Sequence, residues 1–332
     1  MEQITLLTPY DNAAVSLQTE LQQRFWEENT EAATRRLGEQ MVALNQKGGN
    51  NTKPLPVFFS WKGGEAPYEL CVSESADFAA PIKITAEKAE STVYNLKTGQ
   101  TYYWRVGNSK VFTLTTLPSP RWIFAEGLAN IRDLGALPTA CGRKIRQGMV
   151  YRGPRIERAV TGAGVARLRA LGIRTELDLR DEAVGVLTSS PLGEDVRYVQ
   201  LTCKGYEDFL IDEGPAKAKA LFEFLADESV YPVYFHCHGG TDRTGTLAFL
   251  LGAVLGVSQE VLLRDYELSV PQDQVTVDMR RTRWGSLLGR LIEELEKPLY
   301  GEGDLCARGL NALSVCGVSE QTMQAIRDIL LE

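Results

Sequence analysis

The sequence has only two histidines, and its six cysteines are scattered without a Cys-x-x-Cys pair along 332 residues. Scattered cysteines are typical of a protein from a reducing compartment. No apolar run approaches the length needed to span a membrane, and no basic-then-apolar leader opens the sequence. We therefore expect a cytoplasmic protein without a membrane span.

An excess of basic residues is also lacking, because the formal net charge is −7 at pH 7. No broad positive field is available to hold nucleic acid or an anionic membrane surface. A small anionic substrate is still compatible with this charge, since a local pocket can be positive within an acidic protein. Hydrophobic content of 44% and charged content of 24% are those of a globular protein large enough for one or two domains.

The first part of the chain, residues 1–117, is predicted to be an all-β sandwich. Residues 68–73 and 102–106 alternate apolar with polar side chains, and turn-rich segments separate such strands. Short strands at this spacing suggest two packed sheets. Apolar residues at helical spacing within 17–45 predict a helix inserted between the first two strands.

One motif in this part resembles a known domain family. Residues 96–106 read Leu-Lys-Thr-Gly-Gln-Thr-Tyr-Tyr-Trp-Arg-Val. This segment resembles the penultimate-strand signature of fibronectin type III domains, in which the tyrosine matching Tyr102 packs at a sheet corner. The resemblance implies a fibronectin type III-like sandwich that could bind a protein partner.

The second part, residues 118–332, is predicted to be an α/β domain with a central, mostly parallel sheet flanked by helices. Two prolines in 117–120 interrupt regular structure and mark a linker. Beyond it, predicted strands alternate with predicted helices, as in parallel or mixed sheets. The strands are 175–179, 197–201 and 232–236; the helices are 161–172, 215–226, 244–256, 286–296 and 319–331.

The most informative motif follows the strand at 232–236. It reads His-Cys-His-Gly-Gly-Thr-Asp-Arg-Thr over residues 236–244. Gly239 and Gly240 let the chain wrap so that backbone N–H groups face an oxyanion at a helix N-terminus. Such surroundings lower the pKa of a thiol from about 8.5 and favour a thiolate nucleophile at Cys237. Arg243 can grip two phosphate oxygens, and Thr244 can donate to the thiolate.

Two other interpretations of this motif are weaker. A structural cysteine beside a helix start would not need the glycines and the arginine. A zinc site is disfavoured because the consecutive residues His236, Cys237 and His238 cannot all turn toward one tetrahedral ion. We expect neither a metal nor a cofactor, because the arginine and the amides can stabilise the developing charge.

This Cys-x5-Arg loop resembles that of the protein tyrosine phosphatase superfamily, and other segments extend the resemblance. Residues 130–135, 149–153, 171–180 and 265–269 are similar to bacterial tyrosine/serine and dual-specificity phosphatases. The resemblance implies a phosphocysteine mechanism in which His238 and Thr241 also contact the substrate. Members active on lipids usually carry lysine where Thr241 stands, so activity toward phosphoinositides is not implied, although a protonated His238 could partly compensate.

A phosphatase of this kind needs a general acid for the leaving oxygen. In the superfamily this is an aspartate on a mobile loop upstream of the nucleophile, and Asp208 has the best spacing among Glu207, Asp208 and Asp212. In the resembled bacterial group the loop aspartate is the rival, and it matches Asp242. The sequence leaves both open. Asp178 is expected to hold Arg180 or the loop.

Residues 270–300 are a candidate lid, because Arg280, Arg281 and Arg283 form a basic cluster beside Trp284. The cluster could contact a second phosphate, or it could be a solvated face. Cys203 could form a disulfide with Cys237 after oxidation.

We predict a protein tyrosine or dual-specificity phosphatase acting on phosphoproteins or small phosphate esters. One alternative is an inositol-phosphate or phosphoinositide phosphatase, whose pocket would be ringed by Lys204, Arg180 and the Arg280 cluster. The other is a non-catalytic phosphate-binding module.

Overall fold

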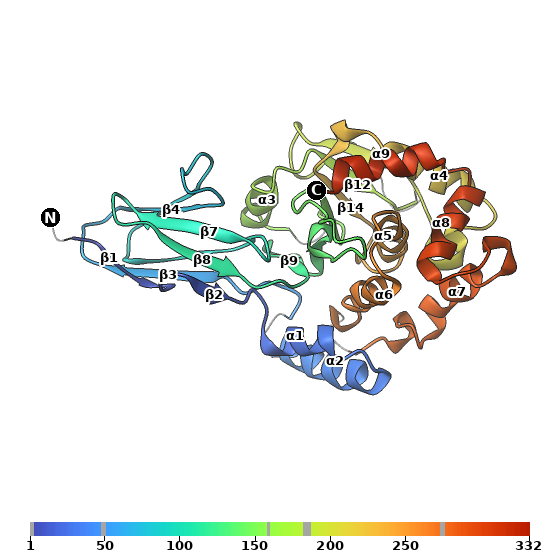
Figure 1. Ribbon diagram of the computed structural model, residues 1–332, viewed down its shortest axis with the longest axis horizontal. Helices are drawn as coiled ribbons and strands as arrows, with labels where there is room; N and C mark the ends of the chain where they lie inside the picture. Colours follow the sequence, from blue (N-terminus) through green and yellow to red (C-terminus); the bar gives the residue numbers. More distant parts are fainter. Residues whose placement is uncertain (1–2, 48–50, 158–159, 182–186, 273–275) are drawn as a thin grey trace. The chain divides into compact units, whose positions relative to one another are not determined.

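The computed structural model describes residues 3–47, 51–157, 160–181, 187–272 and 276–332 (Figure 1). The chain forms two compact units. The first consists of Met1–Glu20 and Pro54–Ser119, and the second of Leu21–Lys53 and Pro120–Glu332. The second unit therefore takes in a segment that lies, in sequence, within the first.

Two β-sheets make up the first unit. One has the strand order β1 (Thr5–Thr8), β3 (Val57–Lys62), β6 (Glu90–Val93). The other has the order β2 (Ala13–Val15), β8 (Phe112–Thr116), β7 (Thr101–Val106), β4 (Tyr68–Ser73), β5 (Ile82–Ala86). Neighbouring strands are antiparallel except that β2 runs parallel to β8. The strands predicted at 68–73 and 102–106 are confirmed.

The alternation in β7 explains how this unit builds its core. Tyr102, Trp104 and Val106 are buried, while the residues between them are partly exposed. The ring of Trp104 lies edge-on to Phe59 at 4.9 Å and to Phe112 at 5.7 Å between centroids. One face of the strand thus supplies large apolar side chains to a single core.

A six-stranded mixed sheet forms the centre of the second unit. Its order is β13 (Arg197–Gln200), β12 (Thr175–Asp178), β14 (Val233–His236), β11 (Val150–Gly153), β10 (Ile131–Asp133), β9 (Arg121–Ile123). The four strands from β13 to β11 are parallel, and β10 runs antiparallel to both of its neighbours. Strands were predicted at β12, β13 and β14, and all three are confirmed.

Helices accompany this sheet, and the five predicted in this unit are present within three residues of the expected bounds. They are α3 (Gly162–Arg169), α4 (Gly214–Leu225), α5 (Asp242–Val254), α7 (Ser286–Leu295) and α9 (Glu320–Leu330). Two further helices are α6 (Gln259–Glu267) and α8 (Leu305–Val315). Short 3-10 turns are η1 (Leu134–Ala136), η3 (Tyr206–Phe209), η4 (Glu228–Val230), η5 (Val270–Gln272), η6 (Met279–Arg281) and η7 (Pro298–Tyr300). Helix α5 packs against α6, α8 and α9, so its side chains are buried on nearly every face (Figure 1).

The segment 17–45 contains two helices, where one was expected: α1 (Glu20–Glu27) and α2 (Glu31–Gln46). The break has a local cause, because Thr30 adopts an extended conformation and its hydroxyl accepts from the Ala33 N–H at 3.2 Å. The insertion was expected between the first two strands, but the helices follow β2 and precede β3, because two short strands come before them. They also group with the second unit rather than the first.

The reason for this grouping is the apolar face of the two helices. Phe25, Leu37 and Met41 are buried in one cluster with Trp122 and Leu268 of the second unit. The buried guanidinium of Arg264 on α6 also donates to the Thr34 hydroxyl at 3.1 Å. Burial of this stripe favours docking on the second unit by the hydrophobic effect.

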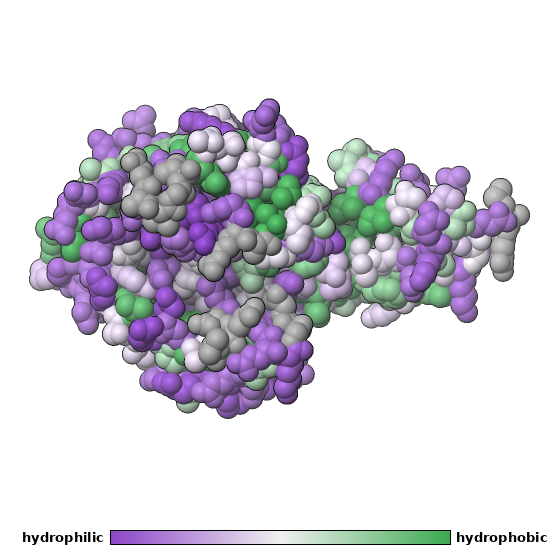
Figure 2. All heavy atoms as spheres, turned by 180° about the vertical axis from the view of Figure 1, so that it is seen from behind, coloured by the Kyte–Doolittle hydropathy of each residue, from purple (hydrophilic) through white to green (hydrophobic). Residues whose placement is uncertain are grey.

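The surface shows where the remaining apolar residues lie. On the face drawn in Figure 2, hydrophilic residues dominate and hydrophobic residues gather in small patches between them. None of the helices within the described residues is long and apolar enough to cross a membrane. The candidate lid at 270–300 comprises η5, η6, α7 and η7, and its residues 273–275 lie outside the described part of the chain.

Candidate active site

The Cys237 loop connects the buried strand β14 to the N-terminus of α5. Gly240 within this loop has φ of +70°, a conformation that favours glycine. A Cβ atom at this position would lie 2.4 Å from the backbone carbon of Gly153 on β11. The tight wrap predicted from the two glycines therefore depends on Gly240 in particular.

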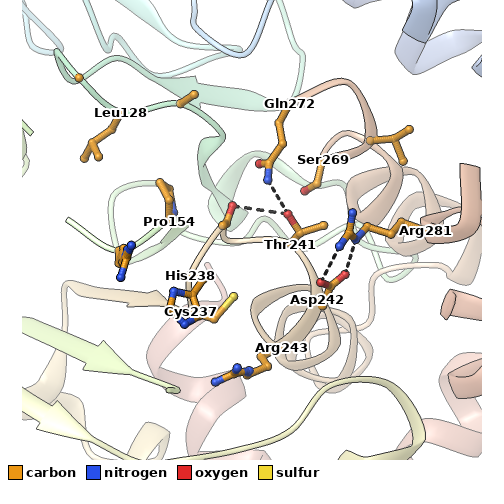
Figure 3. Close-up of a pocket in the computed structure, with 15 residues that line it drawn as sticks. Leu128, Pro154, Cys237, His238, Thr241, Asp242, Arg243, Ser269, Gln272 and Arg281 are labelled. Carbon is orange, nitrogen blue, oxygen red and sulfur yellow. Dashed lines mark hydrogen bonds and ion pairs between the residues drawn. The ribbon is translucent and has the colours of Figure 1, made fainter. Parts of the chain in front are cut away.

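A cavity of about 500 Å³ opens above this loop. Its lining is Gly127, Leu128, Ala129, Pro154, Arg155, Cys237, His238, Gly239, Thr241, Asp242, Arg243, Ser269, Val270, Gln272 and Arg281. Figure 3 shows the side chains of Cys237, Asp242 and Arg243 together at one end of this space. The cavity thus brings the loop together with residues more than 30 positions after Cys237 and with residues more than 80 positions before it.

Arg243 is the cation nearest in sequence to the nucleophile candidate. Its side chain is 24% exposed, its closest carboxylate oxygen is Asp181 Oδ2 at 4.0 Å, and its Nη1 donates to the Leu179 carbonyl at 3.5 Å. These contacts are long, so most of the donors on the guanidinium are available for an anion. Thr241 is held on the opposite side by Gln272, whose Nε2 donates to the hydroxyl at 2.7 Å (Figure 3).

Asp242 lies in a set of close contacts at the cavity wall. Arg281 donates through Nε to Oδ1 at 2.8 Å and through Nη2 to Oδ2 at 3.2 Å (Figure 3). The Tyr206 hydroxyl also donates to Oδ1. Burial, followed by the charge of Asp242, raises the pKa of Tyr206, so this phenol is a donor at neutral pH.

Arg281 is itself shared between two carboxylates. Its Nη1 lies 2.6 Å from Asp278 Oδ2, and burial by itself would lower the pKa of Arg281, but the hydrogen bonds to Asp242 raise it. Arg280 of the same cluster is exposed and pairs with Asp278 at 2.8 Å. Of these two arginines, only Arg281 lines the cavity.

His238 carries little positive charge at neutral pH. Burial comes first among the causes that lower its pKa below the usual 6.5, and the charge of Arg155 comes second. Arg180 and Arg243 act in the same direction. The idea that a protonated His238 replaces the missing lysine of the lipid-active group is therefore not favoured by this environment.

A buried network behind the loop is built from three of the segments that extended the family resemblance beyond the loop. Asp265 accepts from Arg132 Nε at 3.0 Å and from Arg152 Nη1 at 2.6 Å. Arg152 Nη2 also donates to the Gly240 carbonyl at 3.0 Å, and Asn130 Nδ2 lies 3.4 Å from the same oxygen. Burial would raise the pKa of Asp265, but the two arginines lower it, so the carboxylate is charged and fixes the loop from behind.

Asp178 holds Arg180, as expected from the sequence. Arg180 Nε lies 2.9 Å from both carboxylate oxygens of Asp178, and its Nη1 lies 2.5 Å from Glu157 Oε1. Both partners are buried, and Asp178 has a lowered pKa: burial opposes this shift and the Arg180 hydrogen bonds cause it. The neighbouring His236 bonds Glu176 Oε1 at 2.9 Å and the Cys237 carbonyl at 3.1 Å.

Several candidate residues lie elsewhere. Asp208 and Lys204 line a separate small hollow with Asp212, and Asp208 Oδ2 lies 3.6 Å from Arg290. Glu207 also pairs with Arg290. Gly240 and Thr244 are not among the lining residues of the main cavity. Within the described part of the chain, the buried Thr244 hydroxyl has no hydrogen-bond partner, so it is available to a group at Cys237.

Four lining residues bring chemistry that the loop motif alone does not contain: Arg155, Ser269, Gln272 and Arg281. Arg281 was noticed as one member of a basic cluster, and Ser269 as the end of a family-like segment. Arg155 and Gln272 carry no local signal. They reach the cavity because β11 pairs with β14 and because η5 follows α6.

The redox hypothesis concerns Cys203 and Cys237, which are buried in one core cluster. All six cysteines are free in the structure, which describes each of them. Burial raises the pKa of the Cys203 thiol, so Cys203 is unreactive unless its surroundings open.

Comparison with known proteins places this site in a family. Residues 123–332 match the tyrosine phosphatase family. A protein of Cupriavidus necator named "Putative tyrosine-protein phosphatase" is 31% identical over 166 residues, which are 42% of this chain. The aligned part covers 60% of the length of that relative. The core catalytic domain of PP-IP phosphatase SIW14 from S. cerevisiae, solved with citrate, shares 15% identity over 38% of this chain and 75% of that chain, with a TM-score of 0.29.

The family match covers β10–β14 and α3–α9, including the Cys237 loop and the cavity. The chain belongs to the tyrosine phosphatase family.

Proposed function

We propose that this protein is a cysteine-dependent phosphatase that hydrolyses phosphomonoesters, with phosphotyrosine in proteins as the main substrate. The observation that carries the proposal is that Cys237, Arg243 and Asp242 line one cavity at the N-terminus of α5. A thiol, a guanidinium and a carboxyl group are the three side chains that phosphate ester cleavage through a thiolate requires.

In the first step Cys237 Sγ attacks phosphorus, and the bond from phosphorus to the ester oxygen breaks. Arg243 and the loop N–H groups, those of Gly239 and Gly240 among them, stabilise the equatorial oxygens of the transition state. The carboxyl group of Asp242 gives its proton to the leaving oxygen. In the second step Asp242 takes a proton from water, the water oxygen attacks phosphorus, and the sulfur–phosphorus bond breaks, with the Thr244 hydroxyl donating to the departing thiolate.

Asp242 is a better candidate than Asp208 for the general acid. Asp242 lines the cavity with Cys237, whereas Asp208 lines a different hollow and lies near Arg290. A general acid has to reach the ester oxygen within hydrogen-bond distance, directly or through one water. Use of Asp208 would require η3 to move toward the cavity.

An inositol-phosphate phosphatase is the second candidate, and the observation that bears on it is the position of the cations. Lys204 and Arg280 do not line the cavity, and Arg180 is buried against Asp178 and Glu157. A polyphosphate needs several free cations around the pocket. Arg155, Arg243 and Arg281 do line the cavity, but Arg281 is paired with Asp242 and Asp278. The other two arginines are less neutralised and favour a substrate with fewer charges than a polyphosphate, such as phosphotyrosine, or phosphoserine and phosphothreonine for a dual-specificity enzyme.

The first unit is proposed to be a fibronectin type III-like sandwich that binds a protein partner. The Tyr102 hydroxyl accepts from the Lys97 N–H at 2.8 Å, which is the kind of corner contact seen in such sandwiches. Its core is separate from that of the second unit. A reducing compartment suits the whole protein, because the thiolate at Cys237 has to stay unoxidised.

Hydrolysis of p-nitrophenyl phosphate in the presence of a metal chelator tests the proposal. We expect turnover by the wild-type protein and none by Cys237→Ser, with Cys141→Ser as the matched control because Cys141 is exposed and outside the cavity. Turnover by Cys237→Ser would contradict the mechanism. A panel of phosphotyrosine, phosphoserine and inositol phosphate substrates then ranks the substrate classes, and binding of phosphopeptide without any turnover would favour a phosphate-binding module.

A further inference from the structure

Among the described residues, three arginines line the cavity, and the proposed phosphatase mechanism uses only Arg243. Arg155 lines the cavity together with Cys237 and His238, and its side chain is 21% exposed. Arg155 lies two residues beyond the end of β11, far from the loop helix in sequence. The proposed mechanism assigns no role to Arg155.

The backbone presents this arginine in a fixed place. The Arg155 N–H donates to the His238 carbonyl at 3.2 Å, and the carbonyl of the preceding Pro154 accepts from the Tyr234 hydroxyl at 2.6 Å. Strand β11 is also paired with β14, which leads into the Cys237 loop. The position of Arg155 is thus tied to the position of the loop itself.

The charge of Arg155 is poorly neutralised. The closest carboxylate oxygen among the described residues is Glu157 Oε1, at 4.0 Å from Nη1. That same oxygen is 2.5 Å from Arg180 Nη1, so it is already engaged by a closer guanidinium. Among the charges that lower the pKa of His238, that of Arg155 is the strongest, which shows that its field reaches into the cavity.

The other lining cations differ from Arg155 in this respect. Arg281 is within 2.8 Å of Asp242 and of Asp278. Arg243 is assigned to the phosphoryl group that reacts at Cys237. A cavity of about 500 Å³ is also larger than one phosphoryl group requires, and Leu128, Pro154 and Val270 supply an apolar wall for an aromatic ring.

We propose that Arg155 binds a second anionic group on the substrate, so that the preferred substrates are phosphotyrosine peptides with an acidic side chain next to the phosphotyrosine. This inference rests on the proposed phosphatase function and specifies its substrate class. The arginine would pair with the carboxylate through two parallel hydrogen bonds. Lipid-active phosphatases usually carry a lysine at the position of Thr241. Arg155 would supply a positive charge at the cavity rim in place of that lysine.

The test compares two phosphotyrosine peptides that differ only in having glutamate or glutamine on either side of the phosphotyrosine. For the wild-type protein we expect kcat/KM to be about tenfold higher for the glutamate peptide, as for one charge-assisted hydrogen bond in a partly buried site. In Arg155→Gln this ratio should fall to about one, and Arg155→Lys should restore part of it. Arg35→Gln is the matched control, because Arg35 on α2 is exposed and its loss changes the net charge equally.

A folding defect is separated from a specificity effect by binding measurements. The Cys237→Ser variant cannot turn over substrate, so peptide binding can be measured in it. The dissociation constants of the glutamate and glutamine peptides should differ for Cys237→Ser and should be equal for the double variant that also carries Arg155→Gln. Equal treatment of the two peptides by the wild-type protein would overturn the inference while leaving the phosphatase function intact. If the wild-type protein hydrolysed neither of the two peptides nor p-nitrophenyl phosphate, the proposed function itself would be overturned. A preference for inositol polyphosphates that Arg155→Gln abolishes, without a preference between the peptides, would also overturn the assignment to phosphopeptides.

Discussion

Arg281 Nε lies 2.8 Å from Asp242 Oδ1, and its Nη2 lies 3.2 Å from Asp242 Oδ2. This bidentate contact joins η6 to the first residue of α5. While the contact lasts, Asp242 accepts hydrogen bonds from the guanidinium, so proton donation by Asp242 requires that Arg281 move or that substrate displace it. In the phosphatase mechanism proposed above, Arg281 would act as a positioning residue for Asp242.

The role proposed for Asp242 predicts a dependence on the leaving group. Asp242→Ala should lower kcat about 100-fold or more for alkyl phosphates, which need a protonated leaving oxygen, and far less for p-nitrophenyl phosphate. Asp208→Ala is the matched control and should leave both rates near those of the wild-type protein. Steady-state rates on the two substrates measure this. If the leaving-group dependence follows Asp208 instead, η3 supplies the acid, and if neither variant shows it, both assignments are wrong.

The two loop glycines should respond differently to the same substitution. Gly240→Ala places a Cβ 2.4 Å from the Gly153 backbone at a φ of +70°, so the loop has to shift. A displacement of about 1 Å at a reacting group can cost about 100-fold in rate, and we expect kcat/KM to fall by that order. Gly239→Ala meets only the flexible end of Gln272 at 3.0 Å and should cost much less. Equal losses in two folded variants would contradict the assigned role of Gly240.

The grouping of α2 with the second unit predicts which unfolding transition a core mutation affects. Leu37→Ala removes a fully buried side chain from the cluster that contains Trp122 and Leu268, and should cost about 2–5 kcal/mol of unfolding free energy. The loss should appear in the transition that vanadate, a phosphate analogue, stabilises. Leu114→Ala, in the core of the first unit, is the matched control and should shift the other transition. Thermal unfolding with and without vanadate checks this, and the reverse assignment would refute it.

His238 predicts a pH dependence of stability. Its pKa in the folded protein is below the usual 6.5, so the unfolded chain binds the proton first as pH falls. Stability contributed by neutral His238 is therefore fully present above about pH 6.5 and is lost as pH falls toward the lowered value. His238→Gln should flatten this part of the profile relative to the wild-type protein, as measured by urea unfolding from pH 7.5 to 5. A wild-type profile that the substitution leaves unchanged would contradict the shift.

Contiguous signals made much of the second unit predictable. The strand at 233–236, the loop with its glycines and the helix beginning at Asp242 lie within 22 consecutive residues, so their geometry follows from local backbone preferences and apolar patterning. Thr161 and Ser319 likewise cap α3 and α9 where their side chains predicted it. The contact between Asp178 and Arg180 was also foreseeable, because both residues leave the same strand.

Non-local contacts decided the rest. Nothing in 17–45 indicates that its apolar stripe covers Trp122 and Leu268 rather than the sandwich core, because an apolar stripe specifies burial but not a partner. That Asp242 lines the cavity and Asp208 does not is likewise a tertiary observation, and the proposal of Asp242 as the acid rests on it. Nothing in the local sequence marks Arg155 or Gln272 as site residues. They line the cavity with Cys237 only because β11 pairs with β14 and because η5 follows α6.

The Cys237 loop, its helix and the chemistry they support were thus determined by the sequence alone, because a phosphate-binding loop is built from neighbouring residues. The cavity around the loop was decided only by the tertiary structure. Its remaining walls come from segments more than 80 residues before Cys237 and more than 30 after it, and only packing brings these segments together.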